Sequence, residues 1–174
     1  MNDVVSTFPL LRLPIDAILN TFRTMDPVQI FGVSLLSKKT KNIVKSFKIT
    51  AETLKVEVTD MFKINLFFPS DTPLHFKLYQ VSENQSLQEL GTPENIHIHC
   101  NSQEMVWTNS MNVKQLLDHL KFIFHKQIDL LLFKENCERF NLESVYKNVT
   151  DVRKITISSG THEHNKRILS LFQQ

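Results

Sequence analysis

Residues 8–47 read FPLLRLPIDAILNTFRTMDPVQIFGVSLLSKKTKNIVKSF and contain signals that predict three short helices. Pro14 suits the first turn of the first helix, because its missing N–H would have no partner there. Asp26 followed by Pro27 is typical of the start of a second helix, and Ser37 suits the N-cap of a third. The stretch therefore predicts a small three-helix unit near the N-terminus.

These helices carry more large apolar side chains than three short helices can cover by themselves. Ile15, Ile18, Leu19 and Phe22 recur at the spacing of one helix face. The second helix is apolar on nearly every side, and helices of about ten residues need tertiary burial to be stable. Two explanations stay open: a protein partner covers the surplus surface, or the rest of the chain does.

Composition excludes several classes of protein. The 174 residues are 41% apolar and 22% charged, close to the averages of folded domains. A formal net charge of +2 gives no argument for nucleic acid as the main partner. The sequence contains no run of 18 or more apolar residues, so a membrane span is not predicted. Two cysteines make no disulfide framework and the N-terminus is a poor secretory signal, so an intracellular protein of the cytoplasm or nucleus is expected.

After Phe47 the apolar period changes from helical to alternating. TLKVEVTD, FKINLFFPSDTP and HFKLYQVSE, which begin at residues 53, 62 and 75, predict three half-buried strands. Residues 83–95 are polar and contain Gly91, which predicts a loop. IHIHCN and MVWTN predict two more short extended segments. We expect an α+β fold in which the strands lean towards antiparallel pairing.

The last third of the chain predicts helices alternating with strands. NVKQLLDHLKFIF forms a helix pattern, and IDLLLF (128–133) and VRKITIS (152–158) read as strands, each followed by a helix. The two strand–helix units are offset by about 25 residues when Leu130 is aligned with Ile155, a spacing typical of leucine-rich-repeat-like units. An ordinary β-α-β-α segment is the open alternative. The end at Gln174, just after LSLF, predicts a shortened array.

The histidines do not predict a metal site. His97 and His99 fall on one face of their predicted strand and Cys100 on the other, so at most two of the three converge. His162 and His164 have no thiolate pair near them. Structural zinc sites use four convergent ligands, usually in closely spaced pairs that are missing here. We therefore expect no metal and no cofactor.

Catalytic and nucleic-acid-binding functions are not favoured either. Cys137 is expected in an exposed loop as an inert thiol, and no nucleophile elbow, phosphate-binding loop or dinucleotide fingerprint occurs. The lysines of residues 38–48 have no interleaved aromatic residues for base stacking, so a solvated helix face is expected. A small hydrolase or transferase remains a rival that convergent titratable groups in a pocket would support.

The spaced residues of the first stretch resemble an F-box, in the form found in the large nematode F-box families. The matching positions are Leu13-Pro14, Ile18, Leu19, Phe22, Met25-Asp26-Pro27, Ile30 and Val33-Ser34-Leu35-Leu36-Ser37-Lys38. The sequence departs from the motif after the lysine, where the usual Arg-Trp pair is Lys39-Thr40. The lost aromatic anchor is expected to weaken adaptor binding.

The C-terminal region resembles the type-2 F-box-associated region of the same families. Trp107 precedes a helix in which His119-Leu120 and Ile123-Phe124 occur, and a strand and FNLESV follow. The two resemblances imply the substrate-recognition subunit of a Skp-cullin-F-box ubiquitin ligase, which binds a Skp-family adaptor, through it a cullin, and an unknown protein target. Such a subunit is not an enzyme. The alternative is a non-catalytic interaction protein that binds the adaptor without supporting ubiquitination.

The resemblance divides the chain into four parts and implies a set of contact residues. We expect a flexible N-terminus at 1–7, the F-box at 8–48, a strand-rich connecting region at 49–110, and F-box-associated, leucine-rich-repeat-like units at 111–174. No residue is assigned to target binding. The expected adaptor-binding residues, with the lysine as a rim charge, are Leu13, Pro14, Ile18, Leu19, Phe22, Ile30, Val33, Leu36 and Lys38. Some of them must pack between the helices instead.

Overall fold

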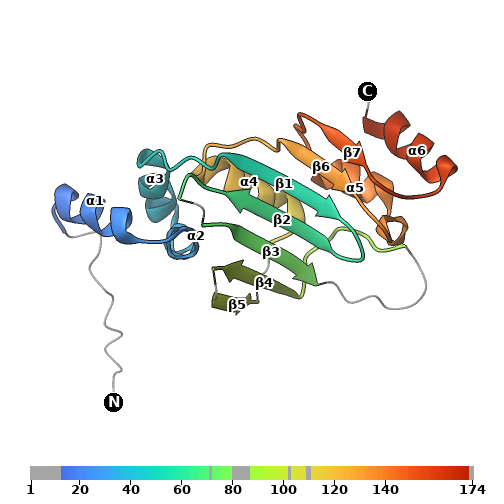
Figure 1. The fold of residues 1–174 in the computed structure, drawn as a ribbon. Helices are drawn as coiled ribbons and strands as arrows, with labels where there is room; N and C mark the ends of the chain where they lie inside the picture. Colours follow the sequence, from blue (N-terminus) through green and yellow to red (C-terminus); the bar gives the residue numbers. More distant parts are fainter. Residues whose placement is uncertain (1–12, 71, 80–86, 102, 109–110, 173–174) are drawn as a thin grey trace, which may run out of the picture.

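The N-terminal part of the described chain is built from three helices joined by tight corners (Figure 1). The computed structural model describes residues 13–70, 72–79, 87–101, 103–108 and 111–172. The helices are α1 (Ile15–Thr24), α2 (Pro27–Leu35) and α3 (Lys38–Ser46). The prediction of three helices is confirmed, while the segment 1–7 lies outside the described residues.

Five strands follow as an antiparallel meander, as the alternating sequence predicts. They are β1 (Thr53–Val58), β2 (Phe62–Phe67), β3 (Leu74–Tyr79), β4 (Asn95–Cys100) and β5 (Gln103–Trp107). Between β3 and β4, residues 83–86 of the predicted loop lie outside the described residues. Residues 87–94 contain only an isolated bridge, from Gln88 to Phe140.

The C-terminal third alternates helices and strands, also as predicted. Its elements are α4 (Val113–Ile123), β6 (Leu130–Phe133), α5 (Leu142–Asn148), β7 (Ile155–Ile157) and α6 (His162–Phe172). β6 pairs in parallel with β1, and β7 pairs in parallel with β6. The result is one mixed seven-stranded sheet in the order β5-β4-β3-β2-β1-β6-β7. Among the described residues, no helix is long and apolar enough to cross a membrane.

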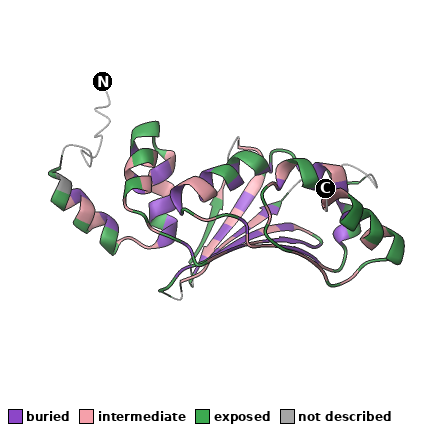
Figure 2. Cartoon of the chain, turned by 90° about the horizontal axis from the view of Figure 1, so that it is seen from above, coloured by how far each residue is buried: buried purple, intermediate pink, exposed green. Residues whose placement is uncertain are grey.

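The sheet has one covered face and one open face. Seen from above, α4, α5 and the three N-terminal helices lie on the same side of the strands, and the other side carries no described helix (Figure 2). Side chains alternate accordingly: Val56, Ile64 and Phe76 are fully buried under the helices. Lys55, Lys77 and His97 are among the half-buried residues of the other, open face. The core under the helices is one continuous hydrophobic cluster.

The described residues do not show leucine-rich-repeat-like units. β6 and β7 extend the same sheet as β1 to β5, so the alternative of an ordinary β-α-β-α segment describes what they form. The pairing also differs by one residue from the sequence alignment, because Leu131, not Leu130, lies opposite Ile155. In a single sheet the register follows from burial of Leu131 and Phe133 on the covered face.

Candidate functional site

The corners between the N-terminal helices are fixed by two capping boxes. The Gln29 N–H donates to the Asp26 carboxylate at 3.2 Å, and the Asp26 N–H donates back to Gln29 Oε1 at 3.1 Å. In the second box the Thr40 N–H donates to Ser37 Oγ at 3.1 Å, and the Ser37 N–H donates to Thr40 Oγ1 at 2.9 Å. Each box satisfies backbone donors that a helix start leaves unpaired.

Thr40 therefore has a structural role at the position where the F-box motif usually has an aromatic residue. It is 4% exposed and its hydroxyl also donates to the Ser37 carbonyl oxygen at 2.8 Å. A tryptophan has no side-chain acceptor for the Ser37 N–H, so it could not close this box. Thr40 thus replaces the aromatic anchor with a side chain that completes the hydrogen bonds at the start of α3.

The structure separates the nine expected adaptor-binding residues by exposure. Leu13, Pro14, Leu36 and Lys38 are exposed, and Leu36 is 74% exposed at the corner between α2 and α3. Leu19 and Val33 are half-buried. An isobutyl group as open as that of Leu36 gains little from folding and is available to a partner.

The other three expected residues belong to the interior of the chain. Ile18, Phe22 and Ile30 are 5%, 2% and 3% exposed. The ring of Phe22 lies 4.5 Å, between centroids, from that of Phe47 at the end of α3, which holds α1 against α3. Their expected direct contact with a partner is not supported by this burial, because neighbouring side chains of the same chain already cover them.

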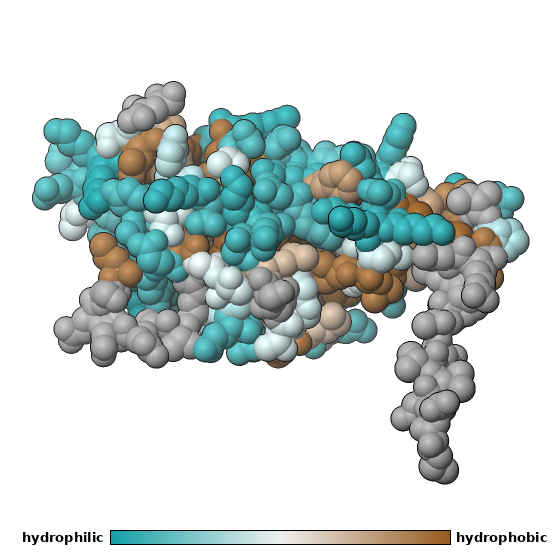
Figure 3. Space-filling view, turned by 180° about the vertical axis from the view of Figure 1, so that it is seen from behind, coloured by the Kyte–Doolittle hydropathy of each residue, from teal (hydrophilic) through white to brown (hydrophobic). Residues whose placement is uncertain are grey.

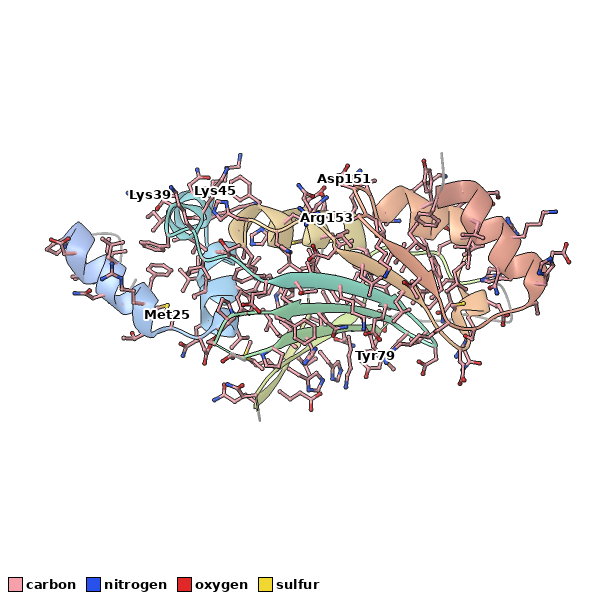
Figure 4. The ribbon with its side chains drawn as sticks, turned by 45° about the horizontal axis from the view of Figure 1, so that its top comes forward. Met25, Lys39, Lys45, Tyr79, Asp151 and Arg153 are labelled. Carbon is pink, nitrogen blue, oxygen red and sulfur yellow. The ribbon has the colours of Figure 1, made fainter. Side chains whose placement is uncertain are left out.

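An apolar groove lies beside these residues, between α1 and the turn after β2. It has a volume of about 550 Å³, and Leu19, Met25, Phe47, Phe68 and Pro69 are among the residues that line it. Met25 marks the end of α1 nearest the sheet in Figure 4. From behind, hydrophilic residues cover most of the helical side; hydrophobic residues show at the end that carries α1 to α3, and also along the lower part and at the opposite end (Figure 3). The groove could not be predicted from the sequence, because one of its walls is the turn after β2, whose position depends on the fold.

The lysines of α3 form a partly packed face. The ammonium groups of Lys41 and Lys45 lie 4.7 Å and 4.1 Å from the centroid of the Phe122 ring of α4. Both distances are those of cation–π contacts. Lys39 and Lys45 extend from the outer side of α3, away from the sheet (Figure 4). The expected solvated face is thus exposed at Lys38 and Lys39 and packed on α4 at the other two.

The side of α2 that carries Phe31 is buried in the core, whereas Leu36, at the corner between α2 and α3, is exposed. The ring of Phe31 is 1% exposed and makes edge contacts with Phe76 at 5.1 Å, Trp107 at 5.4 Å and His119 at 5.8 Å, between centroids. The rest of the chain therefore covers this part of the surplus apolar surface. The other part, at Leu13 and Leu36, stays exposed. The rest of the chain thus covers one side of the three-helix unit, and the other side is left open to a partner.

A buried hydrogen bond joins the same helix to α4. Ser34 Oγ lies 2.6 Å from the Phe31 carbonyl oxygen and 2.7 Å from His119 Nε2. Because the carbonyl can only accept, the single serine proton points to it and His119 Nε2 donates to Ser34. Burial, with a smaller contribution from Lys41, lowers the pKa of His119 to about 4. The imidazole is therefore neutral near pH 7.

This serine–histidine pair is not the start of a hydrolase site. A general base must accept the serine proton, whereas here the histidine donates. Both side chains are also closed off from substrate, at 2% and 4% exposed. The geometry makes the pair a structural link between the N-terminal helices and α4.

Cys137 was expected in an exposed loop, and that expectation is wrong. It is fully buried in the short 3-10 helix Cys137–Arg139, with Sγ 3.6 Å from His164 Nε2. Burial raises the pKa of the thiol, and the nearby Glu138 carboxylate adds to the shift. A thiol held protonated is a poor nucleophile, so the expected lack of reactivity agrees with this environment.

The histidines of β4 lie as the strand pattern predicts. His97 and His99 are half-buried on the open face and Cys100 is buried on the covered face. Glu104 of β5, whose Oε1 lies 2.9 Å from His97 Nδ1, was not expected near these histidines. The signal that could have pointed to Glu104 is Asn101, a residue type that favours tight hairpins and has φ 55° here. A two-residue hairpin loop after Cys100 places Glu104 opposite His99.

Comparison with known proteins identifies the N-terminal unit. Residues 10–52 match the family model of the F-box domain. No curated protein and no solved structure matches the chain. An F-box implies binding to a Skp-family adaptor and, through it, to a cullin, and proteins that carry one are generally non-catalytic subunits of such ligases.

Proposed function

We propose that this chain is the substrate-recognition subunit of a Skp-cullin-F-box ubiquitin ligase. The F-box at residues 10–52 would bind the adaptor, and the region after it would hold a target protein. The observation that carries the proposal is the F-box match, together with the exposed leucines on that same unit. Exposed leucines on a three-helix unit whose other side is already packed are typical of a protein interface.

For the adaptor surface we propose Leu13, Pro14, Leu36 and Lys38, with Leu19 and Val33 at its margin. Each large apolar side chain that becomes buried contributes about 1.5–3 kcal/mol, and the lysine adds a rim charge that favours an acidic partner. Ile18, Phe22 and Ile30 support this surface from inside the chain. A change to any of these three would act on folding first.

The proposed mechanism is proximity without chemistry in this subunit. A target held by the region after residue 52 would experience a raised effective concentration of the ubiquitin-charged enzyme carried by the cullin. Rigid connection between the two binding regions favours this role, because it fixes the distance the target must span. Phe31 and the Ser34–His119 hydrogen bond provide such a connection.

We further propose that residues 49–110 and 111–174 together form the target-holding part. The resemblance of residues 107–157 to the type-2 F-box-associated region of nematode F-box families supports this role. The open face of the sheet offers a surface free of described helices, and Phe67, Tyr79 and Val106 lie exposed on it.

Co-expression with a Skp-family adaptor tests the first half of the proposal. The wild-type chain should co-purify with the adaptor, and a Leu13→Glu, Leu36→Glu double variant should not, because two carboxylates would replace the apolar anchors. Leu169→Glu on α6 is the matched control, since that leucine is also exposed, at 43%, but lies outside the F-box. A wild-type chain that fails to bind any Skp-family adaptor would refute the proposal.

Reconstitution with cullin tests the second half. Ubiquitinated proteins trapped by the complete complex should disappear when Phe67→Ala and Tyr79→Ala are combined, while adaptor binding persists. A complex that assembles but marks no protein in the presence of cell extract would favour the alternative of an interaction protein that binds the adaptor without supporting ubiquitination.

A further inference from the structure

The β4–β5 hairpin gathers three side chains that can bind a metal ion. His97 and His99 are two residues apart on one strand, and Glu104 lies directly opposite His99 on the next. Their ligand atoms all lie within 4.8 Å of one another. Residues two apart on a strand share a face, and opposite residues of an antiparallel pair are close neighbours.

One carboxylate oxygen faces both imidazoles. Glu104 Oε1 lies 2.9 Å from His97 Nδ1 and 3.4 Å from His99 Nε2. Ligands about 2.0–2.2 Å from a tetrahedral zinc ion are roughly 3.3 Å from one another. The two separations from Glu104 Oε1 are close to that value, and all three ligand atoms lie within 4.8 Å of one another, so side-chain rotations would place them around one ion.

The Nε2 atom of His99 lacks a hydrogen-bond partner among the described residues. The His99 side chain is 26% exposed, yet its Nε2 atom is closed off from water and has no hydrogen-bond partner among the described residues. The 3.4 Å approach to Glu104 does not have the geometry of a hydrogen bond. A polar atom left in this way costs free energy that a metal bond would offset.

The neighbours of the cluster hold it in place on the open face. The ring of Tyr79 lies 4.5 Å from that of His97, between centroids, and Tyr79 is seen at the end of β3 in Figure 4. His75 lies opposite His99 on β3, with Nδ1 2.7 Å from Asn65 Oδ1. Such surrounding contacts limit ring rotation and orient the ligating nitrogens.

We propose that His97, His99 and Glu104 bind one zinc ion. Two imidazoles and a carboxylate suit zinc and neighbouring first-row metals, whereas Mg²⁺ and Ca²⁺ prefer oxygen ligands. Three protein ligands leave a fourth tetrahedral position open on the solvent side. The ion would join the edge strand β5 to β4. This proposal does not depend on the proposed ligase function, because its ligands lie outside the F-box.

Zinc competition measurements test the site. The full chain, stripped of metal by a chelator, is titrated with Zn²⁺ in the presence of a chromophoric indicator. We expect one zinc ion per chain, and at least tenfold weaker binding in Glu104→Gln and in His99→Ala. His162→Ala removes an exposed histidine of α6 and should bind as the wild type does.

A thermal melt separates folding from ligation. Glu104→Gln keeps the side-chain shape and an oxygen that can accept a hydrogen bond from His97, so its metal-free melting temperature should stay close to that of the wild type. Zinc should raise the melting temperature of the wild type much more than that of the variant. Absence of a saturable one-to-one zinc site in the wild type would overturn the proposal. The proposal would also be overturned if both ligand variants bound zinc as tightly as the wild type, or if Mg²⁺ raised the melting temperature of the wild type as much as Zn²⁺ does.

Discussion

His119 Nε2 on α4 donates a hydrogen bond to Ser34 Oγ on α2 across 2.7 Å, in a site where both side chains are almost completely buried. The bond joins the F-box to the rest of the chain over a separation of 85 residues. The bond stabilises the fold while the imidazole is neutral, because a second ring proton would create a buried positive charge without solvent around it. The F-box and the sheet are thus connected by a group that titrates.

Acid should weaken this connection. The pKa of His119 is lowered from 6.5 to about 4 in the folded chain, so the unfolded state binds a proton first as pH falls. The stabilising contribution is complete above about pH 6.5 and is lost progressively between there and pH 4. At about 1.4 kcal/mol per pKa unit, the total loss is on the order of 3 kcal/mol.

Urea unfolding of wild type and His119→Gln at a series of pH values measures the loss. Glutamine keeps an N–H donor but does not titrate, so the difference in unfolding free energy between the two proteins should shrink or reverse as pH falls from 6.5 to 4. His162→Gln on the surface controls for loss of a histidine. A difference that stays constant over this range would contradict the buried neutral imidazole.

The F-box should not fold well by itself. Phe31 and Ser34 of α2 are buried against β3, β5 and α4, so a fragment of residues 8–52 would expose them to water. We expect little helical circular dichroism from that fragment at 25 °C and no cooperative melting transition. A fragment that melts cooperatively would show that the packing on the sheet is dispensable.

Thr40→Val should remove the second capping box while keeping the side-chain shape. The Ser37 N–H would lose its acceptor at 2.9 Å, and the loss of a helix cap costs about 0.5–2 kcal/mol. Thr92→Val, at an exposed position in the β3–β4 connection, is the control. Equal unfolding free energies for the two variants would rule out a structural role for the Thr40 hydroxyl.

The elements of the fold were predictable because their signals are local. Asp26 and Ser37 mark helix starts through hydrogen bonds to residues three positions away, and the strands show their period within six residues. The parallel pairing of β6 with β1 was not predictable in this way. It joins segments about 75 residues apart, and its register depends on which face of Leu131 and Phe133 is buried.

The candidate site was predictable only in part for the same reason. The spacing of the F-box residues indicated the unit, but only the folded chain shows which of them are exposed and open to a partner. Ile30 and Leu36 are both apolar residues of the same motif, yet one is 3% and the other 74% exposed. The burial of Cys137 and the approach of Glu104 to His97 likewise depend on neighbours brought close by the sheet.

The most direct test of the account is the affinity of the chain for a Skp-family adaptor, measured by titration calorimetry for wild type and Leu36→Ala. Truncating an interface leucine should weaken binding about tenfold to a hundredfold, while the melting temperature of the free chain stays unchanged because Leu36 is exposed. An unchanged dissociation constant would contradict the placement of Leu36 at the interface. Absence of binding by the wild type would contradict the adaptor function itself.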